Sequence, residues 1–129
     1  MGPKSSIQGS NPCVSARFHF IREGTMPAKG YWIGQVDVTD PERYRAYIAA
    51  NAVAFRNYGG RFLVRGGASE TVDGRGRARV VVIEFKDYAT ALACYRSAEY
   101  AEALALRKGA SISDVTIVEG YDGPQPADD

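Results

Sequence analysis

Arg65, Gly66 and Gly67 form one group of residues that could bind a ligand, because they end the short segment RFLVRG. An arginine at the end of a strand can hold a carboxylate or a phosphate through two parallel hydrogen bonds. Glycines beside it would let a ligand approach the backbone closely. The alternative is a salt bridge at the strand end, followed by a flexible turn. The spacing matches no phosphate-binding loop.

Glu84 is the candidate catalytic residue, as a general acid or base, because it lies in the apolar run VVVIEF. A carboxylate in such a run is costly to bury without a partner, and a positioned carboxylate can transfer protons. It is predicted to share a strand face with Val80 and Val82. The structural alternative is an ion pair with Arg65 or Arg61 on the neighbouring strand, and one pair could serve both roles.

A third group comprises Tyr95, Ser97 and Tyr100 in the segment CYRSAEY. Two phenols could orient a small oxygenated ligand, whereas Ser97 most simply caps a helix and the tyrosines most simply pack. Asn51 lies among apolar neighbours on a predicted helix face. A polar side chain there is either hydrogen-bonded internally or lines a cavity. These four residues complete the predicted ligand site.

The single histidine of the sequence, His19, lies within the first 25 residues. The remaining chain therefore lacks the usual haem ligand and the usual proton carrier at neutral pH. Hydrolysis by a Ser-His-Asp triad and a histidine zinc site are likewise disfavoured. Catalysis would have to rest on Glu84, Asp37, a tyrosine or Arg65. We expect no metal site and no cofactor.

Hydrophobic periodicity predicts the elements that position these residues. The segment at 30–38 alternates like a strand, with Trp32 on one face and Tyr31 on the other. Asp40 and Pro41 are suited to start a helix that ends at Gly59. Asp87 is suited to start a second helical stretch, which restarts at Ser97 and runs to Gly109. Further strands are predicted at 61–66, 79–85 and 116–121. The strand at 79–85 is the most apolar and is expected to be central in the sheet.

This order of elements, β-α-β-β-α-β, predicts an α+β ferredoxin-like domain with an antiparallel sheet and its helices on one face. Both faces of the predicted sheet carry apolar or aromatic residues. A large exposed apolar face is unusual on a monomer. Two sheets pairing face to face across a two-fold axis would cover it. We therefore expect a homodimer, in which a barrel closes only when two copies meet.

Composition sets limits on partners and location. The 129 residues are 45% hydrophobic and 24% charged, which is ordinary for one globular domain. A formal charge of +1 opposes general attraction to nucleic acid or membranes, and the arginines Arg75, Arg77 and Arg79 are interpreted as a solvated hairpin tip. No apolar run approaches the roughly 20 residues that span a bilayer. Cys13 and Cys94 form no disulfide framework, which favours a cytoplasmic protein.

The first 25 residues differ from the rest, with Gly, Ser, Pro and Asn scattered among them and no sustained period. We interpret residues 1–25 as an N-terminal extension, a tag remnant or a misplaced start. They lack the apolar stretch of about 7–15 residues that a secretory signal requires. Residues 26–123 are predicted to form the domain, and the polar segment 124–129 to be a frayed tail.

Several segments together resemble a known bacterial family. They are KGYWIGQVDVTDPERYRAY, AFRNYGGRFLVRGG, VVVIEF, ALACYRSAEYAEALALRKGAS and IVEGYDG, in order from Lys29 to Gly123. The family is the domain of unknown function numbered thirteen-thirty, within the dimeric α/β-barrel superfamily. The resemblance implies the fold argued above and no particular activity. Related families of that superfamily include cofactor-free monooxygenases, muconolactone isomerases and haem-handling enzymes, and fold alone does not choose among them.

Three functional hypotheses remain open on the sequence. The first is a homodimeric domain that binds a small molecule near the junction of helices and sheet, with or without catalysis. The second is a cofactor-independent oxygenase or isomerase of small aromatic or oxygenated compounds, with Glu84 carrying the proton. The third is a structural or regulatory dimer without catalysis. A cavity of a few hundred cubic ångströms with an unpartnered Arg65 or Glu84 would favour the first two.

Overall fold

The computed structural model describes residues 27–128, so the predicted extension at 1–25, with His19 and Cys13, lies outside the described part. The elements follow the order β-α-β-β-α-α-β, with a short turn of 3₁₀ helix at the end. Their bounds are β2 (Gly30–Val38), α1 (Pro41–Tyr58), β3 (Arg61–Arg65), β4 (Arg79–Phe85), α2 (Tyr88–Tyr95), α3 (Ala98–Arg107), β5 (Ser111–Glu119) and η1 (Pro126–Asp128).

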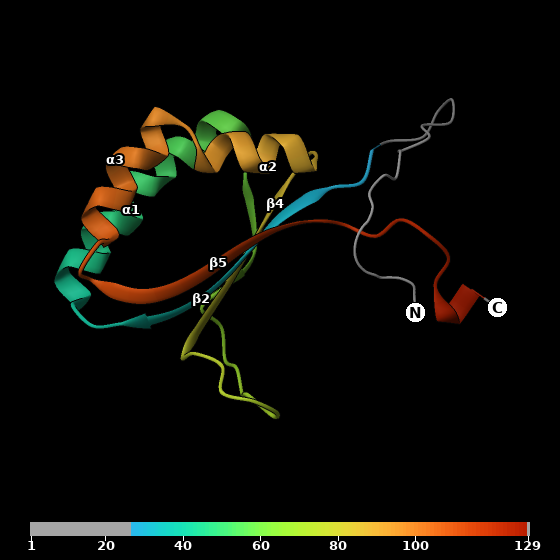
Figure 1. Cartoon of the computed structure of the whole chain (residues 1–129), viewed down its shortest axis with the longest axis horizontal. Coiled ribbons are helices and arrows are strands. Elements are labelled where there is room, and N and C mark those ends of the chain that lie inside the picture. Colours follow the sequence, from blue (N-terminus) through green and yellow to red (C-terminus); the bar gives the residue numbers. More distant parts are fainter. Residues whose placement is uncertain (1–26, 129) are drawn as a thin grey trace.

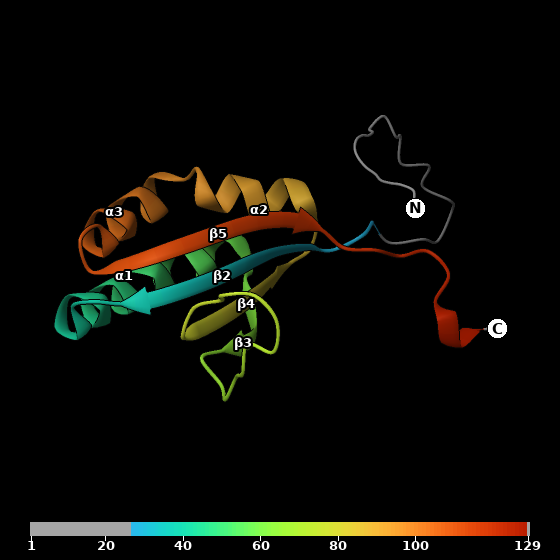
Figure 2. The same cartoon turned by 60° about the horizontal axis from the view of Figure 1, so that its bottom comes forward.

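The four strands form one antiparallel sheet in the order β3-β4-β2-β5. The most apolar strand, β4, is internal, as predicted. All three helices lie on one side of the sheet, and no described element covers the other side (Figures 1 and 2). This is the predicted ferredoxin-like arrangement. The single chain does not close into a barrel.

Local sequence signals account for the helix ends. The side chain of Asp40 accepts a hydrogen bond from the backbone N–H of Arg43 at 3.2 Å and so caps α1. Gly59 ends the helix with a φ of 72°, a left-handed conformation that costs a glycine little. Asp87 caps α2 through the N–H of Thr90, and Ser97 caps α3. These caps confirm the predicted starts of all three helices.

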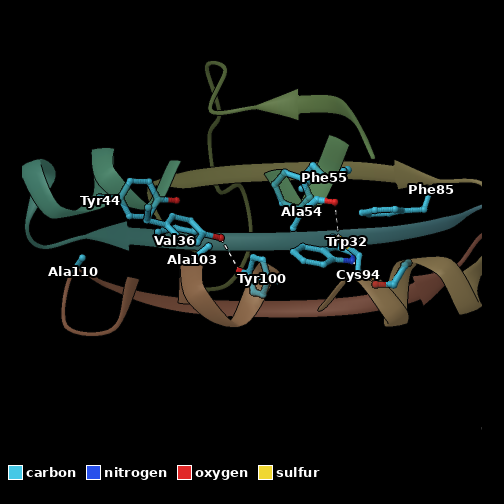
Figure 3. Close-up of a cluster of buried hydrophobic side chains, with 13 residues drawn as sticks. Trp32, Val36, Tyr44, Ala54, Phe55, Phe85, Cys94, Tyr100, Ala103 and Ala110 are labelled. Carbon is cyan, nitrogen blue, oxygen red and sulfur yellow. Dashed lines mark hydrogen bonds between the residues drawn. The ribbon is translucent and has the colours of Figure 1, made fainter. Parts of the chain in front are cut away.

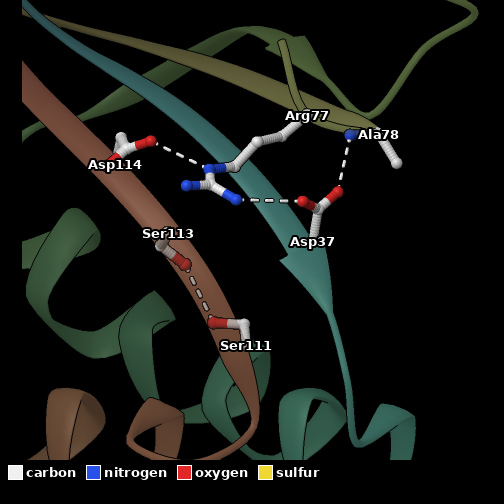
Figure 4. Close-up of polar contacts among 6 residues, drawn as sticks. All are labelled: Asp37, Arg77, Ala78, Ser111, Ser113 and Asp114. Atoms are coloured by element: carbon white, nitrogen blue, oxygen red, sulfur yellow. Dashed lines mark hydrogen bonds and ion pairs between the residues drawn. The ribbon is translucent and has the colours of Figure 1, made fainter. Parts of the chain in front are cut away.

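The predicted bounds of the last strand and the last helix are wrong. The last strand begins at Ser111, five residues before the predicted start, and ends at Glu119 instead of Tyr121. The segment from Ser111 places two serines on the helix-covered face, and their hydroxyls lie 2.8 Å apart (Figure 4). Because these two positions carry small polar residues, this part of the strand lacks the alternation of apolar and polar residues by which a strand is predicted. The last helix ends at Arg107, because Gly109 adopts a φ of 80°.

The core lies between the sheet and the helices and is mainly aromatic (Figure 3). Trp32 is at its centre, with ring centroids 5.1 Å from Phe55 and 5.0 Å from Tyr100, both edge to face. Its indole N–H donates to the carbonyl of Ala91 at 2.8 Å, which ties β2 to α2. Aromatic pairs in these geometries add to the gain from burial alone. Trp32 therefore belongs to the core of the subunit.

Candidate functional site

A small cavity lies between the helix-covered face of the sheet and helices α1 and α3, with a volume of about 40 Å³. It is smaller than the few hundred cubic ångströms expected for a binding domain, and a single water needs about 10–15 Å³ by such a measure. Aromatic side chains form much of its wall. Its polar groups include one amide, three phenols and three guanidinium groups. The lining residues include Trp32, Gly34, Tyr44, Tyr47, Asn51, Phe55, Phe62, Arg65, Arg79, Val81, Tyr100, Arg107 and Val115.

Arg79 is the first residue of β4 and points to the covered face of the sheet, where its guanidinium lies 5.9 Å from the ring centre of Tyr44. Its Nε is buried and has no hydrogen-bond partner among the described residues. A buried charged donor without an acceptor is costly. An acceptor from a ligand would remove that cost.

Gly66 makes the position of Arg79 possible. It follows β3 with a φ of 71°, and its backbone N–H donates to the carbonyl of Val80 at 2.9 Å. A Cβ on Gly66 would collide with the guanidinium of Arg79. The glycine therefore gives space to an arginine of the neighbouring strand, rather than to a ligand approaching its own backbone.

Arg107 ends α3 and reaches the same cavity. It donates a hydrogen bond to the hydroxyl of Tyr100 at 3.3 Å and lies 5.5 Å from the ring centre of Tyr47. The hydroxyls of Tyr47 and Tyr100 are 2.7 Å apart. Burial, and then the neighbouring phenol, raises the pKa of Tyr100 well above its ordinary value. Burial also raises the pKa of Tyr44. Tyr44 and Tyr100 therefore stay protonated near neutral pH and can donate hydrogen bonds.

Arg65, predicted from sequence, also lines the cavity, on the exposed side, where its guanidinium stacks 4.2 Å from the ring centre of Phe62. Together with Arg79 and Arg107 it brings three positive charges to the lining. Among residues 27–128, no aspartate or glutamate lines the cavity. Within the described part of the chain, none of the three arginines forms an ion pair. The cavity is therefore suited to an anion.

Asn51 lies on α1, is buried and lines the cavity. Its amide makes no hydrogen bond to another described residue. Of the two interpretations available from the sequence, the structure therefore favours the cavity-lining one. Asn51 adds a donor and an acceptor to a lining that otherwise offers mainly donors.

Glu84 lies on the opposite, uncovered face of the sheet. It accepts a hydrogen bond from the hydroxyl of Tyr31 at 3.2 Å and pairs with Arg61 at 3.7 Å. The structure thus contains the ion pair with Arg61 that was the structural alternative for this residue. Glu84 and Arg65 are not brought together, because they point to different faces of the sheet.

Of the remaining predicted site residues, only Tyr100 reaches the cavity. Ser97 is fully used as a cap: its hydroxyl donates to the carbonyl of Cys94 at 2.7 Å and accepts from the N–H of Tyr100 at 3.1 Å. Tyr95 packs against Trp32 at 5.5 Å between ring centres. Gly67 is exposed beyond the end of β3. None of these three residues lines the cavity.

Sequence reasoning missed Arg79 and Arg107. Arg79 was grouped with the solvated arginines of the preceding loop, yet its spacing from Val81 and Ile83 gives it the parity of the buried strand face. Arg107 lies seven residues after Tyr100, on the same helix face. Both signals were present in the sequence. Arg79 was interpreted as part of a solvated hairpin tip, and Arg107 was not considered.

No group of three or more His, Cys, Asp or Glu that could hold a metal occurs among residues 27–128. Cys94 is buried, and desolvation raises the pKa of its thiol to about 12, which makes it unreactive. None of the described helices has the length and apolarity needed to cross a membrane.

The sheet order and the helices on one face define a ferredoxin-like domain, with the cavity between the two layers. Residues 29–121 match the family described as Domain of unknown function (DUF1330), and the chain belongs to this family. A search of curated proteins finds no match.

Solved structures show the same fold at low sequence identity. A protein of unknown function from Rhodopseudomonas palustris is 19% identical, with a TM-score of 0.60, over 74% of this chain and 85% of that chain. SnoaB, a cofactor-independent oxygenase from Streptomyces nogalater, is 13% identical, with a TM-score of 0.54, over 77% and 98%. A Bacteroides thetaiotaomicron protein of unknown function, titled as a possible oxidoreductase, is 15% identical, with a TM-score of 0.50, over 72% and 98%.

Proposed function

We propose that this domain binds a small organic anion in the cavity between the sheet and helices α1 and α3. The observation that carries this proposal is the buried Nε of Arg79, which lacks an acceptor among the described residues. A carboxylate would supply that acceptor. The guanidinium of Arg107 and the amide of Asn51 lie in the same lining and can bind the remaining lone pairs.

We propose binding rather than catalysis because the described lining residues include no carboxylate or imidazole to take up a proton. The arginines are permanently charged, and burial raises the pKa values of Tyr44 and Tyr100. Glu84, the predicted proton carrier, faces the other side of the sheet. The likeness to the oxygenase SnoaB is a likeness of fold alone. The activity must therefore be argued from the residues of the site.

The test of this proposal is titration calorimetry with acetate and with acetamide, its neutral analogue of nearly the same shape. We expect acetate to bind and acetamide not to bind. Arg79→Met should lower the affinity for acetate more than tenfold, because a charge-assisted hydrogen bond is lost. Arg45→Gln removes the same charge from an exposed position on α1 and serves as the matched control.

Two results would contradict the anion site. One is equal affinity for acetate and acetamide, which would make charge irrelevant. The other is the failure of wild-type protein to bind any of formate, acetate and inorganic phosphate at millimolar concentration. An equal loss in Arg79→Met and Arg45→Gln would show that general surface charge attracts the ligand.

We also propose that a second copy of the chain docks on the uncovered face of the sheet. Apolar side chains on that face are exposed, among them Ile112 at 54% and Val118 at 43%. The edge strand β5 carries both of them, next to β2. The sequence resemblance to the dimeric α/β-barrel superfamily likewise implies a barrel built from two subunits. Light scattering on the full chain should give twice its 14.0 kDa, and a monomer at micromolar concentration would overturn the proposal.

A further inference from the structure

Tyr47 on α1 and Tyr100 on α3 both line the cavity, and their hydroxyl oxygens lie 2.7 Å apart. We infer that this phenol pair donates a hydrogen bond to the ligand through the hydroxyl of Tyr47, and that the ligand is a carboxylate of one or two carbons. The inference rests on the anion site proposed above. It gives the ligand a second point of attachment besides Arg79, and an upper limit of size.

The hydroxyl hydrogens of the pair outnumber the acceptors that the described residues offer them. Each phenol carries one hydrogen, and the single bond between the two oxygens uses one of the two, whichever phenol donates it. Arg107 supplies no acceptor, because a guanidinium only donates, and it donates to Tyr100 at 3.3 Å. Both phenols are buried. One buried hydroxyl hydrogen is therefore left without an acceptor among residues 27–128.

The bond from Arg107 decides which phenol keeps the free hydrogen. A hydroxyl that accepts from a cation becomes a stronger donor, because each hydrogen bond in a chain polarises the next. Tyr100 therefore donates to Tyr47, and the chain runs from Arg107 through Tyr100 to Tyr47. Tyr100 is wholly buried, whereas Tyr47 keeps 6% exposure. The chain thus ends at the more accessible phenol, whose hydrogen remains for the ligand.

The hydrogen of Tyr47 and the Nε of Arg79 belong to the same cavity lining, and neither has an acceptor among the described residues. Tyr44 lies between them, with its ring centre 5.3 Å from that of Tyr47 and 5.9 Å from the guanidinium of Arg79. The two oxygens of a carboxylate can accept from two separate donors, whereas a monatomic anion has one centre to offer. The lining therefore fits a carboxylate with one oxygen toward Arg79 and the other toward Tyr47.

The volume of the cavity limits the rest of the ligand. About 40 Å³ corresponds to about three waters, since one water needs about 10–15 Å³. A carboxylate group by itself has three heavy atoms, so formate fills the space and acetate, with one carbon more, sets the limit. An aromatic ring does not fit, because benzene occupies a cavity of about 150 Å³.

The test compares the acetate affinities of Tyr47→Phe, Tyr100→Phe and the control Tyr95→Phe with that of wild-type protein. Trp32, the single tryptophan of the sequence, lines the cavity, so its fluorescence can report binding alongside calorimetry. Tyr47→Phe should lower the affinity at least tenfold, because a hydrogen bond to a charged acceptor is lost. Tyr100→Phe should lower it less than fivefold, since Tyr47 keeps its hydrogen and loses only the polarisation. Tyr95→Phe should change it less than twofold, because Tyr95 does not line the cavity.

The thermal midpoints of unfolding should fall in the opposite order. Tyr100→Phe removes the bonds to Arg107 and to Tyr47, whereas Tyr47→Phe removes only the bond between the phenols. Tyr100→Phe is therefore expected to have the lower midpoint and Tyr47→Phe the lower affinity. A purely structural role of the pair would make both losses follow the same order.

The limit of size is tested with a series of carboxylates. Formate and acetate should bind to wild-type protein, and butyrate, with two carbons more than acetate, should bind at least tenfold more weakly than acetate. Butyrate bound as tightly as acetate would overturn the limit.

The remaining outcomes separate this inference from the anion site. If Tyr47→Phe binds acetate like wild type, or if Tyr100→Phe loses more affinity, Tyr47 does not donate to the ligand and the inference is wrong. Loss of acetate binding in Arg79→Met would then still support the anion site. Binding of inorganic phosphate without formate or acetate would keep an anion site and exclude the carboxylate. If none of these anions binds, the proposed function itself fails.

Discussion

Charged side chains on the two faces of the sheet differ in their partners. On the uncovered face, Arg77 bridges Asp37 at 3.0 Å and Asp114 at 2.8 Å (Figure 4), and Glu84 pairs with Arg61. On the covered face, Arg79 has a buried Nε without an acceptor among the described residues.

A buried charged donor without a partner is costly, so stability alone would favour an acceptor for this atom. Both arginines are half-buried, yet Arg77 has two carboxylate partners and Arg79 has none in the described part of the chain. This difference supports the proposal that Arg79 binds a ligand.

The largest expected effect comes from exchanging one arginine on each face. Arg79→Met should lower acetate affinity more than tenfold without lowering the thermal midpoint, because it removes a buried donor that has no acceptor among the described residues. Arg77→Met should lower the midpoint, since Asp37 and Asp114 lose their shared partner, and should leave affinity unchanged. Calorimetric titration and thermal unfolding of both variants measure this contrast. A loss of stability in Arg79→Met and none in Arg77→Met would reverse the comparison.

A charge placed on the uncovered face should break the proposed dimer. Val82→Glu puts a carboxylate in the middle of β4, opposite Ile33 on β2. Burying it against a second copy would leave it without a partner. Light scattering is expected to show a monomer for Val82→Glu, and circular dichroism an intact fold. The matched variant Val82→Ile should stay dimeric. A dimeric Val82→Glu would place the interface elsewhere.

A smaller effect is expected within the covered face at the pair of phenols. Tyr100→Phe removes a hydroxyl bonded to Tyr47 and Arg107, and should cost about 1–2 kcal/mol of unfolding free energy. Tyr95→Phe is the control, because its hydroxyl makes no hydrogen bond to a described residue, and should change stability by under about 0.5 kcal/mol. Chemical denaturation measures both. Equal losses of unfolding free energy in the two variants would show that the hydroxyl of Tyr100 contributes no more to stability than the hydroxyl of Tyr95.

The smallest effect concerns pH on the uncovered face. A hydrogen bond from the backbone N–H of Ala78, and then the side chain of Arg77, lowers the pKa of Asp37. A lowered folded pKa contributes stability that is present above the unfolded value, near 4, and lost as pH falls through the folded value. Asp37→Asn should therefore lower the thermal midpoint slightly at pH 7, and the difference from wild type should shrink toward pH 2.5. A difference independent of pH would exclude this ionisation as its source.

The fold was predictable because its signals are local. Asp40, Asp87 and Ser97 cap their helices as expected, and the alternation around Trp32 gave the two faces of β2. The site was predictable only in part. Arg65, Asn51 and Tyr100 reach the cavity, whereas Glu84 is on the other face of the sheet. The alternation of side chains predicted which strand face carries Glu84. It could not show which face of the sheet the helices cover.

The sequence by itself determined the order of elements, the starts of the helices, the central place of β4 and the family. These depend on capping residues and on periods of two and 3.6, which neighbouring residues set. Only the tertiary structure decided that Arg79 and Arg107 meet at one cavity and that Gly66 makes room for Arg79. Strand register and helix packing bring these residues together from distant parts of the chain, and no local pattern records such a meeting.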